Sequence, residues 1–180
     1  ERAIKLYLEA LEVITRQAWP VEWAAMMNNL AIAYKNRLRG ERADNIEQAI
    51  KYCQQALTVR TQQAMPVEWS QTITNLGNAY SERIYGERGD NLEQAIKCYQ
   101  QALTVRTPQT LPFEWAQTMN NLGIAYSERI HGERGDNLQQ AINCYQQALT
   151  VTTKSALPIE WATAMNNLGN AYRNLAPLLA

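Results

Sequence analysis

The sequence repeats with a period of 46 residues, and no other feature limits the fold so strongly. Residues 66–111 and 112–157 are identical at 34 of 46 positions. Proline, tryptophan and tyrosine mark every copy at the same places: Pro20, Pro66, Pro112 and Pro158; Trp23, Trp69, Trp115 and Trp161; Tyr34, Tyr80, Tyr126 and Tyr172. We therefore expect a single domain over 1–180, with a half repeat at 1–19, full repeats at 20–65, 66–111 and 112–157, and a half repeat at 158–180.

Each copy predicts a pair of helices. In one copy the core-facing residues recur with helical spacing: Trp115, Met119, Leu122, Gly123 and Tyr126. A proline suits the first turn of this helix, and we expect Gly132 to end it in a left-handed conformation. The second helix is predicted to start at three capping boxes: Asp44 with Glu47, Asp90 with Glu93, and Asp136 with Gln139. We expect helices near 1–18, 21–38, 45–62, 67–84, 91–107, 113–130, 137–153 and 159–175.

A single helix pair of this kind cannot bury its apolar stripe, so the pairs must stack to form a continuous core. No segment shows the alternation of a β-strand, and no Asn-Gly hairpin signal occurs. The sequence therefore predicts an all-α fold of stacked antiparallel helix pairs, with about eight helices.

The spacing Leu122-Gly123-x-x-Tyr126, followed by Ala141-x-x-x-Tyr145 and then a proline, resembles the tetratricopeptide repeat (TPR) signature. The motif recurs at Leu76, Gly77 and Tyr80, at Leu168, Gly169 and Tyr172, and, with alanine for glycine, at Leu30, Ala31 and Tyr34. The usual unit has about 34 residues. The 46-residue variety is similar to arrays in large bacterial proteins that precede a caspase-like peptidase domain or a nucleotide-binding switch domain. The resemblance implies a right-handed α-solenoid whose first helices line a concave groove.

Charge and composition exclude several classes of function. Lysine plus arginine number 17 and aspartate plus glutamate number 17, so the net charge is zero, whereas nucleic-acid binders carry a basic excess on at least one face. No apolar stretch approaches the roughly 18 residues that a membrane span needs. We therefore expect neither nucleic acid nor membrane as a partner. We also expect no signal peptide, and a chain cut from a longer protein, since Glu1 begins within the repeat pattern.

The cysteines and the lone histidine favour no chemistry. Cys53, Cys98 and Cys144 occur about once per repeat, which is not a disulfide framework. Stacked helices lie about 8–10 Å apart, so these thiols cannot converge on one metal ion, and free thiols indicate a reducing, cytoplasmic compartment. His131 takes a place that arginine and tyrosine hold in earlier copies, so we expect it to be exposed. We expect no enzyme activity, no metal and no cofactor.

The recurring tryptophans and loop arginines have structural interpretations. The tryptophans of the repeat share the core face, which favours burial over ligand stacking, while Trp19 lies outside the periodic set and is expected to be exposed. The loop at 86–90 lacks the lysine and the spacing of a phosphate-binding loop. We expect weak ion pairs with neighbouring carboxylates for Arg37, Arg42, Arg83, Arg88, Arg129 and Arg134.

Polar amides recur on another face of the first helix. A stripe such as Gln71, Asn75, Asn78 and Glu82 faces away from the core, into the groove that the resemblance implies. An asparagine side chain offers one acceptor and two donors, which match the backbone of an extended peptide. Asparagine ladders bind peptides in some TPR proteins; alternatively, the amides bond to one another and order the stack. The groove candidates are Asn28, Asn29, Gln71, Asn75, Asn78, Gln117, Asn120, Asn121, Asn166, Asn167 and Asn170.

Two functional hypotheses follow. The first is a protein-interaction scaffold that binds an extended peptide or a partner domain, including another domain of its own polypeptide, in the Asn-lined groove. The second is a structural spacer or self-assembly module, because the first helix of the chain is of the kind that follows the last one, so copies can stack head to tail. We expect Pro177 to end the last helix.

Overall fold

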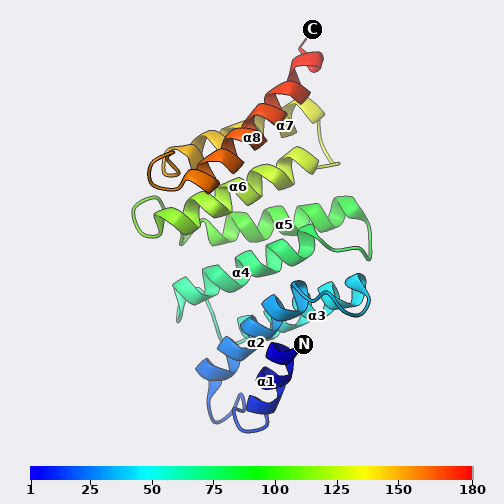
Figure 1. Cartoon of the computed structure of the whole chain (residues 1–180), viewed down its shortest axis with the longest axis vertical. Coiled ribbons are helices and arrows are strands. Elements are labelled where there is room, and N and C mark those ends of the chain that lie inside the picture. Colours follow the sequence, from blue (N-terminus) through cyan, green and yellow to red (C-terminus); the bar gives the residue numbers. More distant parts are fainter. Residues whose placement is uncertain (180) are drawn as a thin grey trace. The chain divides into compact units, whose positions relative to one another are not determined.

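The computed structural model describes residues 1–179. They form helices and connecting turns, with no strand among them (Figure 1). The helices are α1 (Arg2–Ala10), α2 (Pro20–Lys35), α3 (Arg42–Leu57), α4 (Pro66–Ser81), α5 (Arg88–Ala102), α6 (Pro112–Glu128), α7 (Arg134–Leu149), α8 (Pro158–Leu175) and the short 3₁₀ helix η1 (Ala176–Leu178). The prediction of an all-α helical-repeat solenoid is confirmed. The chain divides into two compact units, which are described separately: unit 1 is Glu1–Glu87, and unit 2 begins at Arg88.

In unit 1, α2 packs against α1, α3 and α4. The core between them contains Ile4, Met27, Leu30 and Ala56, all buried. Half-buried aromatic side chains close this core, including Trp23 and the stacked rings of Tyr34 and Tyr52, whose centroids lie 5.4 Å apart. The predicted stripe of the first helix therefore faces the core, as its spacing indicates.

In unit 2, α6 packs against α5 and α7, and α7 packs against α8. Helices α6 and α7 approach closely at Gly123. A Cβ atom built there would lie 2.5 Å from Cε1 of Tyr145, a fully buried side chain. Gly169, the counterpart of Gly123 one period later, has no such neighbour within 4 Å. The glycine of the repeat motif thus makes room for a tyrosine of the next helix.

The first helix of each pair (α2, α4, α6 and α8) begins at the proline of its repeat. Pro20, Pro66, Pro112 and Pro158 each open a helix. The second helices end earlier than expected, for example at Leu57 rather than 62, and α1 ends at Ala10 rather than 18. Threonine hydroxyls explain the early stop in three copies, because each bonds back to a carbonyl three residues earlier: Thr58 to Gln55, Thr104 to Gln101 and Thr150 to Gln147, all at 2.7 Å. At the far end, α8 stops at Leu175 and Pro177 falls in η1, as predicted.

The predicted capping boxes are wrong. Helices α3 and α7 begin three residues before the predicted start, with Glu41 and Glu133 at the N-cap and no side-chain cap bond, so the aspartates of the boxes lie inside the first turn. The buried asparagine that follows them orders the loop instead: Asn137 Nδ2 donates to His131 O at 2.8 Å. The turn before the helix uses a left-handed glycine, Gly132, whose φ is 82°. The expectation that Gly132 ends the preceding helix is wrong, because α6 ends at Glu128 with Arg129 at its C-cap.

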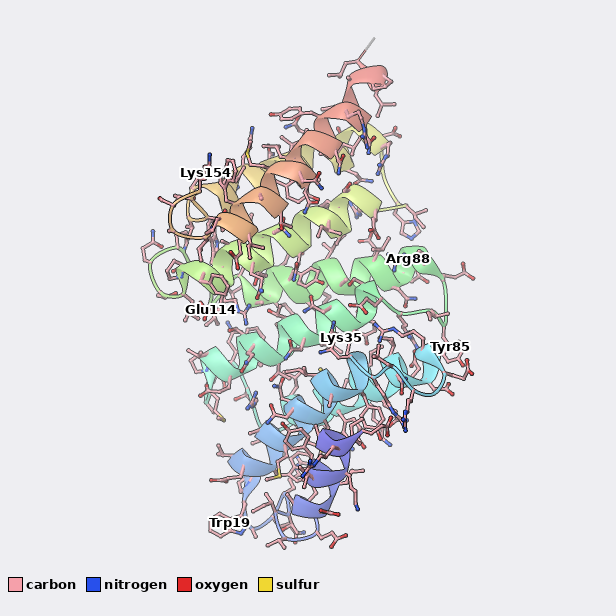
Figure 2. All side chains as sticks on the ribbon, in the orientation of Figure 1. Trp19, Lys35, Tyr85, Arg88, Glu114 and Lys154 are labelled. Atoms are coloured by element: carbon pink, nitrogen blue, oxygen red, sulfur yellow. The ribbon has the colours of Figure 1, made fainter. Side chains whose placement is uncertain are left out.

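The tryptophans of the repeat differ in burial. Trp115 is 9% exposed and belongs to the core, whereas Trp23, Trp69 and Trp161 are half-buried. Cations cover two of these rings from outside, Arg16 over Trp23 and Lys154 over Trp161. Trp19 is 53% exposed in the loop before α2, as predicted (Figure 2).

Candidate functional site

The predicted amide stripe lies on one face of each first helix. In unit 1, Gln71 and Asn29 are exposed, Asn75 and Asn78 are half-buried, and Asn28 is buried. In unit 2 the exposed candidates are Gln117 and Asn166, and the half-buried candidates are Asn120, Asn121, Asn167 and Asn170. We call the unit 2 set, together with Thr163, the Asn face.

Asparagines of successive repeats bond to each other within each unit. In unit 1, Asn75 Nδ2 donates to Asn28 Oδ1 at 3.0 Å. In unit 2, Asn167 Nδ2 donates to Asn120 Oδ1 at 3.1 Å. Both pairs are separated by 47 residues, so the same bond joins the first helices of neighbouring repeats. Each bond uses one N–H of the donor amide, which carries two. These two bonds therefore link the first helices of neighbouring repeats within each unit.

A pocket of about 180 Å³ opens beside these amides in unit 2. Its lining comes from α6, α7 with the turn after it, and α8: Phe113, Ala116, Gln117, Asn120, Asn121, Ala148, Thr152, Ile159, Glu160, Thr163 and Ala164. Exposed Phe113 and Ile159 flank it, and four buried residues, Ala116, Ala148, Thr152 and Ala164, form its base. The structure thus brings Gln117, Asn120 and Asn121 together around one hollow.

The loop arginines form ion pairs, as predicted. Arg83 Nε lies 2.6 Å from Glu47 Oε1, and Arg129 Nε lies 2.6 Å from Glu93 Oε1, each joining a first helix to the second helix before it. Arg37 pairs with Glu1 in the same way, and Arg42 and Arg88 pair with Glu82 and Glu128. Arg134 instead donates to the Ser127 carbonyl. Glu82, at the end of the unit 1 stripe, is therefore engaged in ion pairs.

The cysteines are buried, free thiols. Burial raises the pKa of the Cys98 and Cys144 thiols to about 12, so both are protonated at neutral pH. His131 is exposed, as predicted, with Nε2 3.7 Å from Asp90 Oδ1. Among residues 1–179, no cluster of histidine, cysteine or acidic side chains could hold a metal ion. In the same range, no helix combines the length and the apolar character needed to cross a membrane.

The sequence reasoning missed the base of the pocket. Thr152 and Ala164 are not among the predicted residues, although both differ from the two preceding copies, which have arginine at the first place and threonine at the second. Glu160 and the exposed Ile159 were missed as well. The sequence signal for this place is the change from arginine at residues 60 and 106 to threonine at residue 152, which a pattern of recurring residues does not include.

Comparison with protein families identifies the repeat. The family model described as Sel1 repeat matches residues 24–58, 70–104 and 116–150. The matches start 46 residues apart, and each covers both helices of one pair, from the residue after the repeat tryptophan to the threonine that ends the second helix. The predicted resemblance is confirmed at the level of a TPR-like helical repeat, and the family shown is Sel1. No curated protein matches the chain.

Proposed function

We infer the function from the family: this chain belongs to the Sel1 repeat family, whose members are generally protein-interaction scaffolds. The Sel1 scaffold family is typically non-catalytic, and we propose that this chain is likewise not an enzyme. The repeats bury their apolar stripes in the helix pairs and leave the amide face of the first helices at the surface. Protein interaction through that face is the activity that these features support best.

We propose that the Asn face of unit 2 binds the backbone of an extended peptide or a loop of a partner domain. The observation that carries this proposal is the pocket of about 180 Å³, which is lined by Gln117, Asn120 and Asn121. Amide side chains recognise backbone C=O and N–H groups without regard to sequence, and the pocket beside them can select a side chain. Exposed Phe113 and Ile159 add apolar contact at its edge.

Removing two exposed amides should weaken peptide binding and leave the fold intact. Gln117→Ala with Asn166→Ala removes two hydrogen-bonding groups, each worth about 0.5–1.5 kcal/mol, so affinity for a peptide selected from a random linear library should fall about tenfold. Stability should change by less than about 0.5 kcal/mol per site, because both side chains are exposed. Calorimetric titration and urea unfolding measure the two quantities.

The control for this double variant is Gln147→Ala, because Gln147 is an exposed glutamine on α7 that does not line the pocket. It should change neither affinity nor stability. The competing interpretation, that the amides only order the stack, gives another pattern: Asn167→Ala, which removes the bond to Asn120, destabilises the protein, and the double variant binds the peptide like wild type.

A second candidate, end-to-end self-assembly, is supported by α8. Met165 is 43% exposed there, whereas Met119 at the same place in α6 is 6% exposed, and Ile159 and Tyr172 are exposed too. An open apolar helix face of a solenoid can stack on another copy. Sedimentation should then give a mass that rises with concentration, and Met165→Glu should abolish the rise while Gln147→Glu does not. A constant monomer mass at high concentration removes this candidate.

The proposal also covers the cellular compartment of the chain and the polypeptide to which it belongs. We place the chain in the cytoplasm, as its three free cysteines support. We further propose that residues 1–180 form one repeat array within a longer bacterial polypeptide. A caspase-like peptidase or nucleotide-binding switch domain in that polypeptide would supply the partner or transmit its binding.

A further inference from the structure

Two of the repeats carry a buried arginine after the second helix, Arg60 and Arg106. In unit 1, Arg60 follows α3, and its Nη1 donates to Oγ1 of Thr72 on α4 at 3.0 Å. Burial lowers the pKa of Arg60, while the Glu68 carboxylate acts in the opposite direction and favours the charged guanidinium. In unit 2, Arg106 makes the same bond to Thr118 at 2.9 Å. The repeat thus contains a built site for a guanidinium group between consecutive helices.

The last copy lacks both partners of this bond, as does the first copy, which has Ile14 and Met26 at these places. Thr152 stands two periods after Arg60, and Ala164 stands two periods after Thr72. The acidic residue of the site is kept, as Glu160. The Thr152 hydroxyl is satisfied locally, since it donates to the Ala148 carbonyl at 3.0 Å. The short side chains leave the volume of an arginine side chain unfilled.

The pocket beside the Asn face lies at this place. Thr152, Glu160 and Ala164 are among its lining residues, and no lysine or arginine of the described chain lines it. Lys154, two residues farther on, does not replace the missing cation, because its Nζ lies over the Trp161 ring, 5.9 Å from the centroid. A cavity of about 150 Å³ can hold a benzene ring, so a pocket of about 180 Å³ has room for a planar guanidinium group.

We propose that this pocket receives the guanidinium group of an arginine side chain carried by a bound peptide. The inference rests on the proposed function and names the side chain that the groove selects. The peptide arginine takes the place that Arg60 fills in unit 1, beside Glu160 in place of Glu68. Because the same pocket is lined by Gln117 and Asn121, the peptide backbone can bond to the amides while its side chain enters the pocket.

A set of matched peptides tests the proposal. The probes are blocked Ser/Gly peptides that differ only at a central residue: arginine, lysine, citrulline or alanine. Chemical-shift titration of the side-chain amides on the Asn face measures each affinity. Charge-assisted hydrogen bonds are roughly twice as strong as neutral ones, so the arginine peptide should bind at least about tenfold more tightly than the citrulline and alanine peptides.

A filled-pocket variant provides the second arm. Thr152→Arg with Ala164→Thr recreates the intramolecular pair of unit 1, so the arginine preference should disappear while the alanine peptide binds as it does to wild type. Gln147→Arg adds the same charge on the exposed surface of α7 and should keep the preference. Circular dichroism confirms that both variants are folded.

The outcomes separate this inference from the function on which it rests. Equal binding of the arginine and alanine peptides to wild type overturns the arginine pocket and leaves the Asn face as a backbone-binding surface. An arginine preference that survives in the filled variant also overturns it, because the guanidinium then binds elsewhere. A lysine peptide that binds like arginine replaces guanidinium recognition with recognition of any cation. If no peptide in the set binds at millimolar concentration, both proposals fail.

Discussion

Trp115→Ala should lower the free energy of unfolding by about 3–5 kcal/mol, the usual cost of truncating a large buried side chain. Trp115 is the most buried tryptophan of the repeat, and it sits in the first turn of α6 beside the buried Ala116 and near Met119 on the same face. Its loss leaves a cavity that two packed helices cannot easily close. Urea unfolding followed by circular dichroism measures the change.

Two other tryptophan variants serve as controls for the loss of stability in Trp115→Ala. Trp19→Ala should change stability by less than about 0.5 kcal/mol, because the side chain is exposed in a loop. Trp69→Ala should fall between the two, since Trp69 is half-buried. A Trp115→Ala protein that unfolds at the wild-type urea concentration would show that the first helix of this repeat is rotated from the orientation described here.

Gly123→Ala should destabilise the protein by about 1–3 kcal/mol through overpacking. The new Cβ would lie 2.5 Å from the ring of Tyr145, and that ring is fully buried, so either the ring or helix α6 must move. Helix propensity opposes this loss, because alanine favours a helix over glycine by about 1 kcal/mol. Calorimetric melting of the single variant gives the net effect.

Gly169→Ala is the matched control, because Gly169 occupies the same place in α8 with nothing within 4 Å of its built Cβ. It should stabilise the protein by up to about 1 kcal/mol, the propensity difference alone. Opposite signs for the two substitutions would establish that the glycine of the motif is needed for close approach to a tyrosine. Equal effects would contradict that interpretation.

The helices could be predicted from the sequence because each depends on local signals. Prolines near the expected starts placed the beginnings of α2, α4, α6 and α8 within one residue. The repeat spacing gave the buried face, including Met119 and Leu122. These features follow from the geometry of one helix, for which spacing along the chain is sufficient.

The connections were predicted less well because they depend on side-chain bonds that compete with one another. An aspartate and a glutamate three residues apart indicated a capping box, but the loop is ordered by the buried Asn137 and the left-handed Gly132, so α7 begins earlier. Threonine hydroxyls likewise ended the second helices before their apolar pattern did, as at Thr58. Several local motifs fit the same residues, and packing decides among them.

The candidate site was predicted in part. The amides of the Asn face were identified by recurrence, and the structure places three of them around one pocket. The base of that pocket was not predicted, because Thr152 and Ala164 contribute to it by being shorter than the arginine and threonine at the equivalent places of unit 1. The structure is needed to see this, because the bond between Arg60 and Thr72 shows which side chains fill the same place in unit 1.

The packing of glycine against tyrosine also limits how such a chain can change by recombination. Where α6 has Gly123, the next helix presents Tyr145. Two periods earlier in the chain, α2 has Ala31, and the next helix has Cys53 at the corresponding place and its tyrosine at residue 52. A crossover that separated these two helices would set an alanine methyl against a tyrosine ring. A crossover that exchanged whole helix pairs, each a first helix with the second helix that follows it, would keep these side chains matched. The helix pair with its complementary side chains is therefore the segment that can be exchanged intact.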